Sequence, residues 1–311
     1  MIQSRKVTSP AIFGRVGVLM GGVSGEREIS LKGGKAVLSA LQSQDVNAVG
    51  IDVGDRPMKV LGSQHFDRIF IVVHGRGGED GILQGLLEAL KIPYTGSGIL
   101  GSALAMDKLK TKLCWRGSGI PTPPWQVLND EVDIGTCIEK LGFPVIVKPA
   151  LEGSSLGMSK AGNTNELMDA WKHASKYGCE VFAEAWVEGK EFTVGILGDK
   201  ALPVIGLKTP RAFYDFEAKY RSKSTEYVCP CGLDQQAEKD IQAMALKAAN
   251  TLGVEGWCRA DLLVDSDGEP WFIEVNTVPG MTDHSLVPMA ARSDGMDFDG
   301  LVWRILETSF I

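Results

Sequence analysis

Two acidic residues and an amide in the last third of the sequence have a spacing that suits a divalent cation. Asp261 and the pair Glu274 and Asn276 lie in two apolar segments that a four-residue turn joins. The turn predicts a β-hairpin in which Asp265 pairs with Pro270. Because strand side chains alternate between faces, this register puts Asp261 opposite Glu274, with Asn276 on the same face. Opposed carboxylates repel each other, and Mg²⁺, which prefers carboxylate, amide and phosphate oxygens, would relieve the repulsion.

A cation and a run of backbone amides accompany this hairpin. Arg259 shares a strand face with Asp261, and residues 278–280 follow the second strand directly. Arg259 and the backbone amides of residues 278–280 would stabilise negative charge that develops on a reacting oxygen. The simpler interpretation is a solvated hairpin on which Arg259 only neutralises Asp261, and the sequence leaves both open.

A lysine and a glycine-serine loop form a second candidate site. Lys148 lies near the end of an apolar strand and is followed by GSSLG at 153–157. Glycines let backbone amides approach an anion closely, so this arrangement is typical of phosphate binding. The spacing does not match the Walker A loop. A surface turn with a solvent-directed lysine is the structural alternative.

Three further motifs carry weaker signals. GSGILG at 96–101 matches a dinucleotide-binding pattern, but no clear strand precedes it, so a helix-start turn is the favoured interpretation. Glu26 and Glu28 suit the first turn of a helix electrostatically, and Glu26 would alternatively hold a substrate ammonium group. His74 in HGRGGEDG is either a ligand contact or a hydrogen-bonded structural residue.

The elements that must position these residues alternate strand and helix in the first third of the chain. Residues 15–20, 46–53 and 67–75 predict buried parallel strands with helices between and after them. This pattern predicts an α/β fold that starts with a doubly wound, Rossmann-like domain at residues 1–102.

The remaining sequence predicts two more domains. Residues 103–187 contain a helix from residue 107, a strand around Lys148 and a helix with Thr164 as its N-cap. Residues 188–311 contain the hairpin and, at 209–228, a polar stretch without periodicity. A loop of that length in a compact enzyme is typical of a functional lid.

Composition restricts the class of protein. The chain has 311 residues and a formal net charge of −7, which disfavours nucleic acid and anionic membranes as partners. Of the six cysteines only Cys229 and Cys231 are close in sequence, too few for zinc, so free thiols in a reducing cytosol are expected. Without a signal peptide or an 18-residue apolar run, the predicted location is cytoplasmic.

The whole set of motifs resembles the D-alanine–D-alanine ligases, members of the ATP-grasp superfamily. The resemblance covers nearly the full chain and rests on motifs in the family's order, namely GGVSGEREISL (21–31), HGRGGEDG (74–81), YTGSG (94–98), MDK (106–108), KPALEGSSLGM (148–158), FYDFEAKY (213–220), RADLLVD (259–265) and EVNTVPGMT (274–282). It implies three domains, with an α+β ATP-grasp part that holds ATP between the central and C-terminal domains, and a homodimer.

The resemblance also implies a role for each matching position. The magnesium ligands are Asp261, Glu274 and Asn276. They would hold two Mg²⁺ ions, and Mn²⁺ could take the place of Mg²⁺. The ATP contacts are Lys108, Lys148, Glu184, Trp186, Val187, Glu191 and Phe272. The residues that meet substrate are His74, Lys219, Ser285 and Leu286. The catalytic set is Glu26, Ser154, Tyr220, Arg259 and Gly280, in which Glu26 holds the first ammonium group and connects to Ser154 and Tyr220.

The implied reaction forms D-alanyl phosphate from D-alanine and ATP, and the amine of a second D-alanine then displaces phosphate. Two positions depart from the family. Phe216 stands where many members have tyrosine, and Ala185 replaces a common lysine. Tyr220 accompanies dipeptide formation in the family. Two alternatives stay open: a ligase that uses D-lactate or another acceptor, and a nucleotide-binding regulatory module without turnover.

Overall fold

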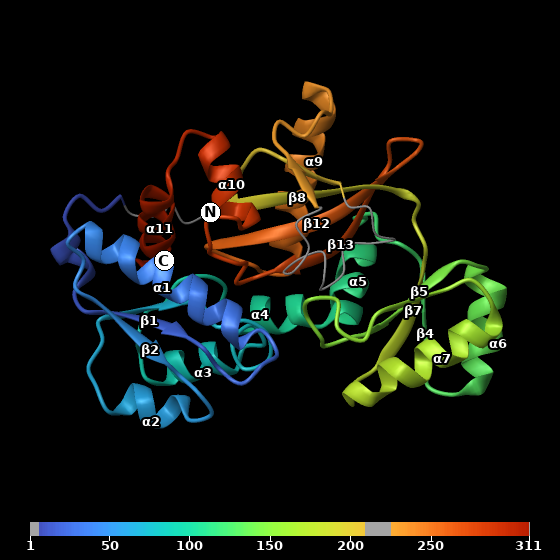
Figure 1. Ribbon diagram of the computed structural model, residues 1–311, viewed down its shortest axis with the longest axis horizontal. Coiled ribbons are helices and arrows are strands. Elements are labelled where there is room, and N and C mark those ends of the chain that lie inside the picture. Colours follow the sequence, from blue (N-terminus) through green and yellow to red (C-terminus); the bar gives the residue numbers. More distant parts are fainter. Residues whose placement is uncertain (1–5, 209–224, 311) are drawn as a thin grey trace.

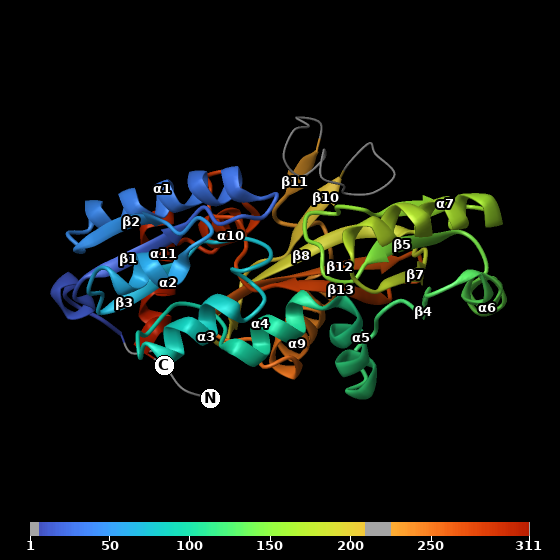
Figure 2. The ribbon, with the colours of Figure 1, turned by 90° about the horizontal axis from the view of Figure 1, so that it is seen from below.

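A computed structural model describes residues 6–208 and 225–310, arranged around three β-sheets. The first is a parallel sheet of order β2-β1-β3, formed by Ala48–Asp52, Val16–Met20 and Arg68–Ile71. Its central strand is buried along its whole length because helices cover both faces. Figure 2 shows α1 (Arg27–Ser43) on one side and α3 (Ile82–Ala89) with α4 (Ile99–Met106) on the other. Helix α2 (Pro57–Gly62) connects β2 to β3.

The second sheet is antiparallel with the order β4-β7-β5-β6. Its strands are Trp125–Val127, Val181–Ala185, Val145–Pro149 and Ser159–Ala161. Helices α6 (Glu131–Leu141) and α7 (Thr164–Ala174) pack on it and share its core. The predicted N-cap of α7 is wrong by one residue. Asn163 keeps extended backbone angles and its side chain accepts the Glu166 N–H at 3.0 Å, whereas Thr164 is already helical.

The third sheet has six strands in the order β11-β10-β8-β12-β13, with β9 paired to β8. The strands are Glu226–Val228, Ile205–Lys208, Gly189–Leu197, Trp257–Asp265, Pro270–Asn276 and Lys200–Ala201. Helix α9 (Gln235–Thr251), capped by Asp234, packs on this sheet as Figures 1 and 2 show. The architecture is therefore mixed α/β, as the sequence predicts.

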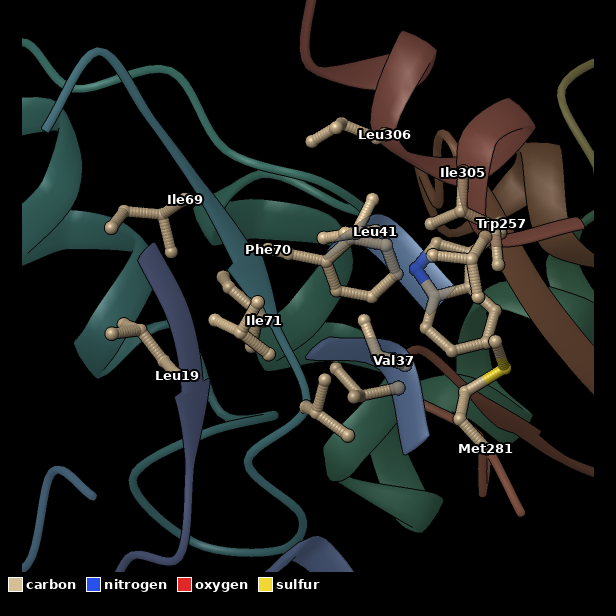
Figure 3. Close-up of a cluster of buried hydrophobic side chains, with 14 of the residues drawn as sticks. Leu19, Val37, Leu41, Ile69, Phe70, Ile71, Trp257, Met281, Ile305 and Leu306 are labelled. Carbon is tan, nitrogen blue, oxygen red and sulfur yellow. The ribbon is translucent and has the colours of Figure 1, made fainter. Parts of the chain in front are cut away.

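The final helices return to the first sheet. Helix α11 (Phe298–Glu307) packs against α1, as Figure 1 shows, and α10 (Leu286–Ser293) contacts α11 and β8. Figure 3 shows their shared core, where Phe70 of β3 and Leu41 of α1 meet Trp257 of β12 and Ile305 of α11. The first and last parts of the chain thus build one hydrophobic core, and the three predicted domain ranges stay a prediction.

Helix α5 (Lys108–Gly117) connects the second and third sheets. Leu109 near its start packs with Ala150 and Phe182 of the second sheet. Trp115 near its end packs edge-on against Phe272 of β13 and donates to the Ala248 carbonyl at 3.0 Å. Asp107 caps the helix by accepting two backbone N–H groups. One short helix therefore carries its lysines into the space between two sheets.

Candidate active site

The hairpin β12–β13 places Asp261 directly opposite Glu274, as the sequence predicts. The expected turn is wrong, however, because Val264 and not Asp265 pairs with Pro270. A β-bulge between Asp261 and Leu262 shifts the register by one residue and restores the predicted pair. The bulge has a second effect. It turns Phe272 to the opposite side of the sheet from Glu274, whereas a regular strand would put both on one side.

Phe272 is for this reason separated from the other predicted ATP contacts. Its ring is fully buried, opposite Leu262, in the core between the third sheet and α9. Ile273, the extra residue of the bulge, is instead partly exposed. The structure does not bring the Phe272 side chain to the carboxylate cluster.

Hydrogen-bond donors surround both carboxylate oxygens of Asp261. Oδ1 accepts from Arg259 Nε at 2.8 Å and from the Thr193 hydroxyl at 2.6 Å. Oδ2 accepts from Arg259 Nη2 at 2.6 Å and from Asn276 Nδ2 at 3.1 Å. Arg259 therefore does neutralise Asp261, as the simpler interpretation of the sequence expects. Because both side chains are 13–14% exposed, the pair remains accessible to a ligand.

Glu274 has a different cation. Its Oε2 lies 3.3 Å from Nζ of Lys108, the first residue of α5. The same ammonium donates to the Glu152 carbonyl at 2.7 Å, in the loop that follows β5. Lys108 therefore connects the hairpin to the glycine-serine loop, and two predicted sites form one continuous group.

The donor set fits magnesium that arrives with phosphate. Within residues 6–208 and 225–310, no three His, Cys, Asp or Glu side chains gather closely enough to bind a metal alone. Mg²⁺ generally takes one or two carboxylates and completes its shell with water and substrate phosphates. Asp261 and Glu274, paired across neighbouring strands, supply that number, and Asn276 lies against Asp261.

Lys148 belongs to a buried cluster on the second sheet. Its Nζ lies 2.8 Å from Glu184 Oε1, and Lys112 Nζ of α5 lies 2.6 Å from Glu184 Oε2. Burial alone would raise the pKa of Glu184, but the two ammonium groups outweigh burial and lower it. Burial lowers the pKa of Lys112 to about 8, against the opposing effect of Glu184. Lys112 is not among the residues that the sequence predicts for the site, because lysines four residues apart on a helix usually indicate a solvated face.

The other predicted nucleoside contacts lie where the second sheet continues into the third. The backbone N–H of Trp186 donates to the Pro144 carbonyl at 3.1 Å. Lys160 Nζ lies 3.8 Å from the centroid of the Trp186 ring. Val187 is partly exposed beside it, in the connection from β7 to β8. Glu191, also partly exposed, pairs with Leu263 two residues along β12 from Asp261.

The glycine-serine loop reaches the start of α1. The Ser154 hydroxyl donates to Glu26 Oε1, which is the contact that the resemblance implies. Ser154 and Ser155 have φ values of 52° and 60°, a conformation that non-glycine residues adopt at a cost of ~1–3 kcal/mol each. A Cβ atom at Gly153 would lie 2.9 Å from Glu26 Oε2, so a larger residue there would displace the Glu26 carboxylate. The loop is therefore held against Glu26 by specific contacts.

A second contact holds the same loop. Arg76, in the turn after His74, lies 3.0 Å from the carboxylate of Glu152.

Three predicted positions of this region, Phe216, Lys219 and Tyr220, lie outside the described residues.

His74 and Glu79 both bind the backbone of Val278. His74 Nδ1 lies 2.8 Å from the Val278 carbonyl, and Glu79 accepts the Val278 N–H at 3.1 Å and the Gly75 N–H at 2.5 Å. Because a carbonyl only accepts, Nδ1 carries the proton, and burial lowers the pKa of His74. Burial, followed by repulsion from Glu26, raises the pKa of Glu79 to about 8. The two residues fix the segment that leads to Gly280.

His74 retains one free position. Its Nε2 is buried and has no hydrogen-bond partner among the residues that the structure describes. In the sequence, Glu79 stands out only by its place in a glycine-rich turn after a strand. That place does not reveal its hydrogen bond to Val278, 199 residues away.

Gly280, Ser285 and Leu286 form the turn into α10. The Ser285 hydroxyl accepts the Thr282 N–H at 2.9 Å, and a Cβ atom at Gly280 would lie 3.0 Å from it. Ser285 is the N-cap of α10, where backbone N–H groups lack helical partners and attract anions. The Leu286 side chain is buried in the shared core, so only its backbone can serve a ligand.

The glycines at 96–101 serve packing. Gly98 begins α4, and a Cβ atom at Gly101 would lie 2.3 Å from the Gly253 carbonyl. The helix-start interpretation is confirmed. A cavity of about 400 Å³ lies close by, between Tyr94, Glu255 and Thr308, and no predicted site residue lines it.

Comparisons with known proteins identify the family of this chain. Residues 114–307 match the family model described as the D-ala D-ala ligase C-terminus, and residues 55–97 match the D-ala D-ala ligase N-terminus. A D-alanine–D-alanine ligase of Methylococcus capsulatus is 60% identical over 98% of this chain and 99% of its own length.

The chain belongs to the D-alanine–D-alanine ligase family. A second relative of that name, from Stutzerimonas stutzeri, is 55% identical over 99% of this chain and 98% of its own length. Membership in this family makes the protein a ligase.

Solved structures show the same fold. A D-alanine–D-alanine ligase from Bacillus anthracis superposes with a TM-score of 0.85 at 35% identity, and covers 95% of this chain and 97% of its own. The structure of that ligase complexed with ATP gives 0.83 at 32% identity over the same shares. VanG, a D-Ala:D-Ser ligase from Enterococcus faecalis, also gives 0.85, at 28% identity over 95% of this chain and 99% of its own. No helix in the described ranges is long and apolar enough to cross a membrane.

Proposed function

We propose that this protein joins two D-alanine molecules to D-alanyl-D-alanine for peptidoglycan precursors and uses one ATP for each bond. The carboxylate of the first D-alanine attacks the γ-phosphorus, which gives D-alanyl phosphate and ADP. The amine of the second D-alanine then attacks the acyl carbon, loses a proton and releases phosphate. The opposed pair Asp261 and Glu274, flanked by Arg259 and Lys108, carries this proposal. ATP supply favours the cytoplasm as the location.

The phosphate end of ATP would lie between the hairpin and α5. Lys108 and Lys148 would offset phosphate charge, since phosphoryl transfer depends mainly on positioning and electrostatics. Asp261, Glu274 and Asn276 would hold one or two Mg²⁺ ions, or Mn²⁺, which would neutralise charge on the transferred group.

The nucleoside end would lie along the connection between the second and third sheets. Trp186 and Val187 would contact adenine, and Glu184 would help to orient the adenine ring. Glu191 would contact the ribose. Their succession from β7 through the connecting segment into β8 supports this assignment. With this assignment ATP binds between the central and the C-terminal ATP-grasp domains, which is where the three-domain prediction places it.

The first D-alanine would be held by its ammonium group. Glu26 would supply the anion, and Ser154, already bonded to Glu26, would fix its orientation. Tyr220 would complete this set from the stretch 209–228, which we propose closes over the site and protects the acyl phosphate from water.

The second D-alanine would lie closer to α10. Ser285, the Leu286 backbone and Lys219 would bind its carboxylate. Arg259 and the Gly280 amide would stabilise the oxyanion of the tetrahedral intermediate. The free Nε2 of buried His74 would face the substrates.

We further propose that the protein is a homodimer. Support comes from α3 and α4, where Ile82, Ile99 and Leu100 are 65%, 43% and 67% exposed. A Gly85 Cβ atom would lie 3.7 Å from the Ile99 side chain, so these exposed side chains belong to adjoining surfaces. Light scattering of the wild type and of Leu100→Glu tests the assignment, with a monomeric wild type as the contrary result.

Product formation tests the ligase proposal. Wild-type protein with Mg²⁺, ATP and D-alanine should release phosphate and form a compound with the mass of the dipeptide. Asp261→Asn should reduce turnover by at least ~10². Asp267→Asn, in the exposed hairpin turn, should match wild type. ATP binding without D-alanine-dependent turnover would instead favour a regulatory module.

The acceptor needs a separate test, because a D-Ala:D-Ser ligase shares this fold with an equal TM-score. A panel of D-alanine, D-serine and D-lactate as second substrates, scored by product mass, decides the specificity. The proposal requires D-alanine to give the highest kcat/KM.

A further inference from the structure

Lys112 is buried beneath the proposed nucleotide site. Its side chain is 1% exposed and its Nζ lies 2.6 Å from Glu184 Oε2. The ammonium also donates to the Thr122 hydroxyl at 2.6 Å and lies 3.4 Å from the Pro123 carbonyl. Lys112 thus combines one ion pair, with Glu184, and two hydrogen bonds to the segment after α5. Lys112 is thus fully engaged inside the protein and does not itself reach a ligand.

The charges of this cluster do not balance. Lys112 and Lys148 contribute two positive charges, and Glu184 contributes one negative charge. All three side chains are at most 4% exposed, so solvent screens the excess weakly. A buried cluster with an excess cation is complementary to an anion, provided that one of its lysines can turn toward that anion.

Lys148 and Lys112 differ in what else they bind. Lys148 has one hydrogen bond in the cluster, to Glu184 at 2.8 Å. Lys112 has further acceptors from the linker after α5, and its Nζ lies 5.5 Å from the centroid of the Trp125 ring. Lys112 is therefore fixed, whereas only Glu184 ties Lys148 in this cluster.

We propose that Lys112 is a positioning residue of the nucleotide site, which keeps Glu184 paired so that the Lys148 ammonium can serve the phosphates of ATP. This inference rests on the proposed function. If Lys112 were absent, transfer of Lys148 to phosphate would leave Glu184 as an unpaired buried charge, which is strongly unfavourable. With Lys112 in place, Glu184 keeps one ion pair throughout.

The first experiment measures ATP binding by calorimetry in the presence of Mg²⁺ on the full-length protein. Lys112→Met should raise the Kd for ATP about tenfold, the size of coupling seen within one ion-pair network. The KM for ATP should rise in parallel, while the KM for D-alanine changes less than about twofold. Lys110→Met is the matched control on the same helix, since Lys110 is half exposed and pairs weakly with Glu180.

A double-mutant cycle separates positioning from a purely structural role. If Lys112 acts through Glu184, then Lys112→Met should have little further effect on ATP affinity, less than about twofold, in a Glu184→Gln background. An equal loss in both backgrounds would overturn the inference. If Lys112→Met does not fold, Lys112→Gln, which retains a donor to Glu184, is compared in the same two backgrounds.

Reference variants distinguish failure of the inference from failure of the proposed function. Lys148→Met should weaken ATP binding whether or not Lys112 acts as a positioning residue. Wild type that does not bind ATP would overturn the proposed function. Wild type that binds, with loss in Lys148→Met and none in Lys112→Met, would overturn only the role of Lys112.

Discussion

Two charged clusters in this protein differ in their balance of charges and in their exposure to solvent. On the second sheet one carboxylate, Glu184, holds two lysines, and the three side chains are 1–4% exposed. On the third sheet two carboxylates, Asp261 and Glu274, are opposed, with exposed fractions of 13% and 17%. The first cluster has a fixed positive excess in a dry interior. The second can exchange its cation partners, because water and ligands reach it.

The difference predicts that the buried cluster contributes mainly to stability and the accessible one mainly to turnover. A charged group that loses its partner in the interior destabilises the fold, whereas a partly exposed carboxylate can be hydrated. The first two of the following changes test the two sides of this contrast, and the others test regions outside the clusters.

The largest effect is expected from Glu184→Ala, which leaves two ammonium groups buried without their carboxylate. The free energy of unfolding should fall by ~3–5 kcal/mol, measured by urea denaturation. Glu180→Ala, at an exposed position of the same region, should change it by less than about 0.5 kcal/mol. Equal small losses in both variants would remove the contrast between the clusters.

Glu274→Gln should have the converse effect. Turnover should fall by about 10²-fold, or ~2.7 kcal/mol of transition-state stabilisation, because a carboxylate that would hold the magnesium ion at the phosphates is lost. The urea midpoint should stay close to wild type. A variant that unfolds easily but retains normal turnover when folded would contradict the assignment.

Glu79 predicts a pH dependence of stability that neither cluster provides. Its pKa is raised from 4.5 to about 8 in the folded protein, so the folded state holds a proton that the unfolded state loses. This stabilisation is fully present below pH 4.5 and is lost as the pH rises toward 8, with a slope of at most ~1.4 kcal/mol per pH unit.

Glu79→Gln should remove that component. The difference in unfolding free energy between wild type and variant, measured from pH 5 to 8, should shift steadily in favour of the variant as the pH rises. A difference that does not vary with pH would show that the Glu79 carboxyl has an ordinary pKa.

The smallest effect concerns the helix that covers the second sheet. Asn163→Ala removes the N-cap of α7 and should lower stability by ~1 kcal/mol. The KM for ATP should not change, because the lysine cluster lies on other elements. A change in KM would show that the buried cluster responds to any loosening of its sheet.

The sequence predicts the strands, the helices and the opposed carboxylates well, because periodicity and turn length report directly on local structure. It does not reveal the bulge at Ile273, because an extra residue in a strand has no reliable signature. The predicted pair is correct although the assumed turn is not. Nor does the sequence show whether Phe272 lies in the core or in the ligand site, because an apolar residue suits both environments equally.

Long-range pairing limits the prediction of the site as well. Lys112, Glu79 and Arg76 depend on partners from distant segments, so their environment follows from the fold alone. Glu26 and Ser154 were linked by resemblance, and the structure shows their bond. The resemblance also supplied the ligand assignments, which residue types alone left open.

The core shared by the first sheet and the last helices affects how the chain matures. Val7 donates to Glu307 across 300 residues, and Phe70 packs against Trp257. During synthesis the first sheet is therefore translated long before the helices that cover it, and its apolar face stays uncovered in the meantime. Such distant contacts slow folding and expose nascent chains to aggregation. Chaperone demand should consequently depend on the final helices, although they lie far in sequence from the strands they protect.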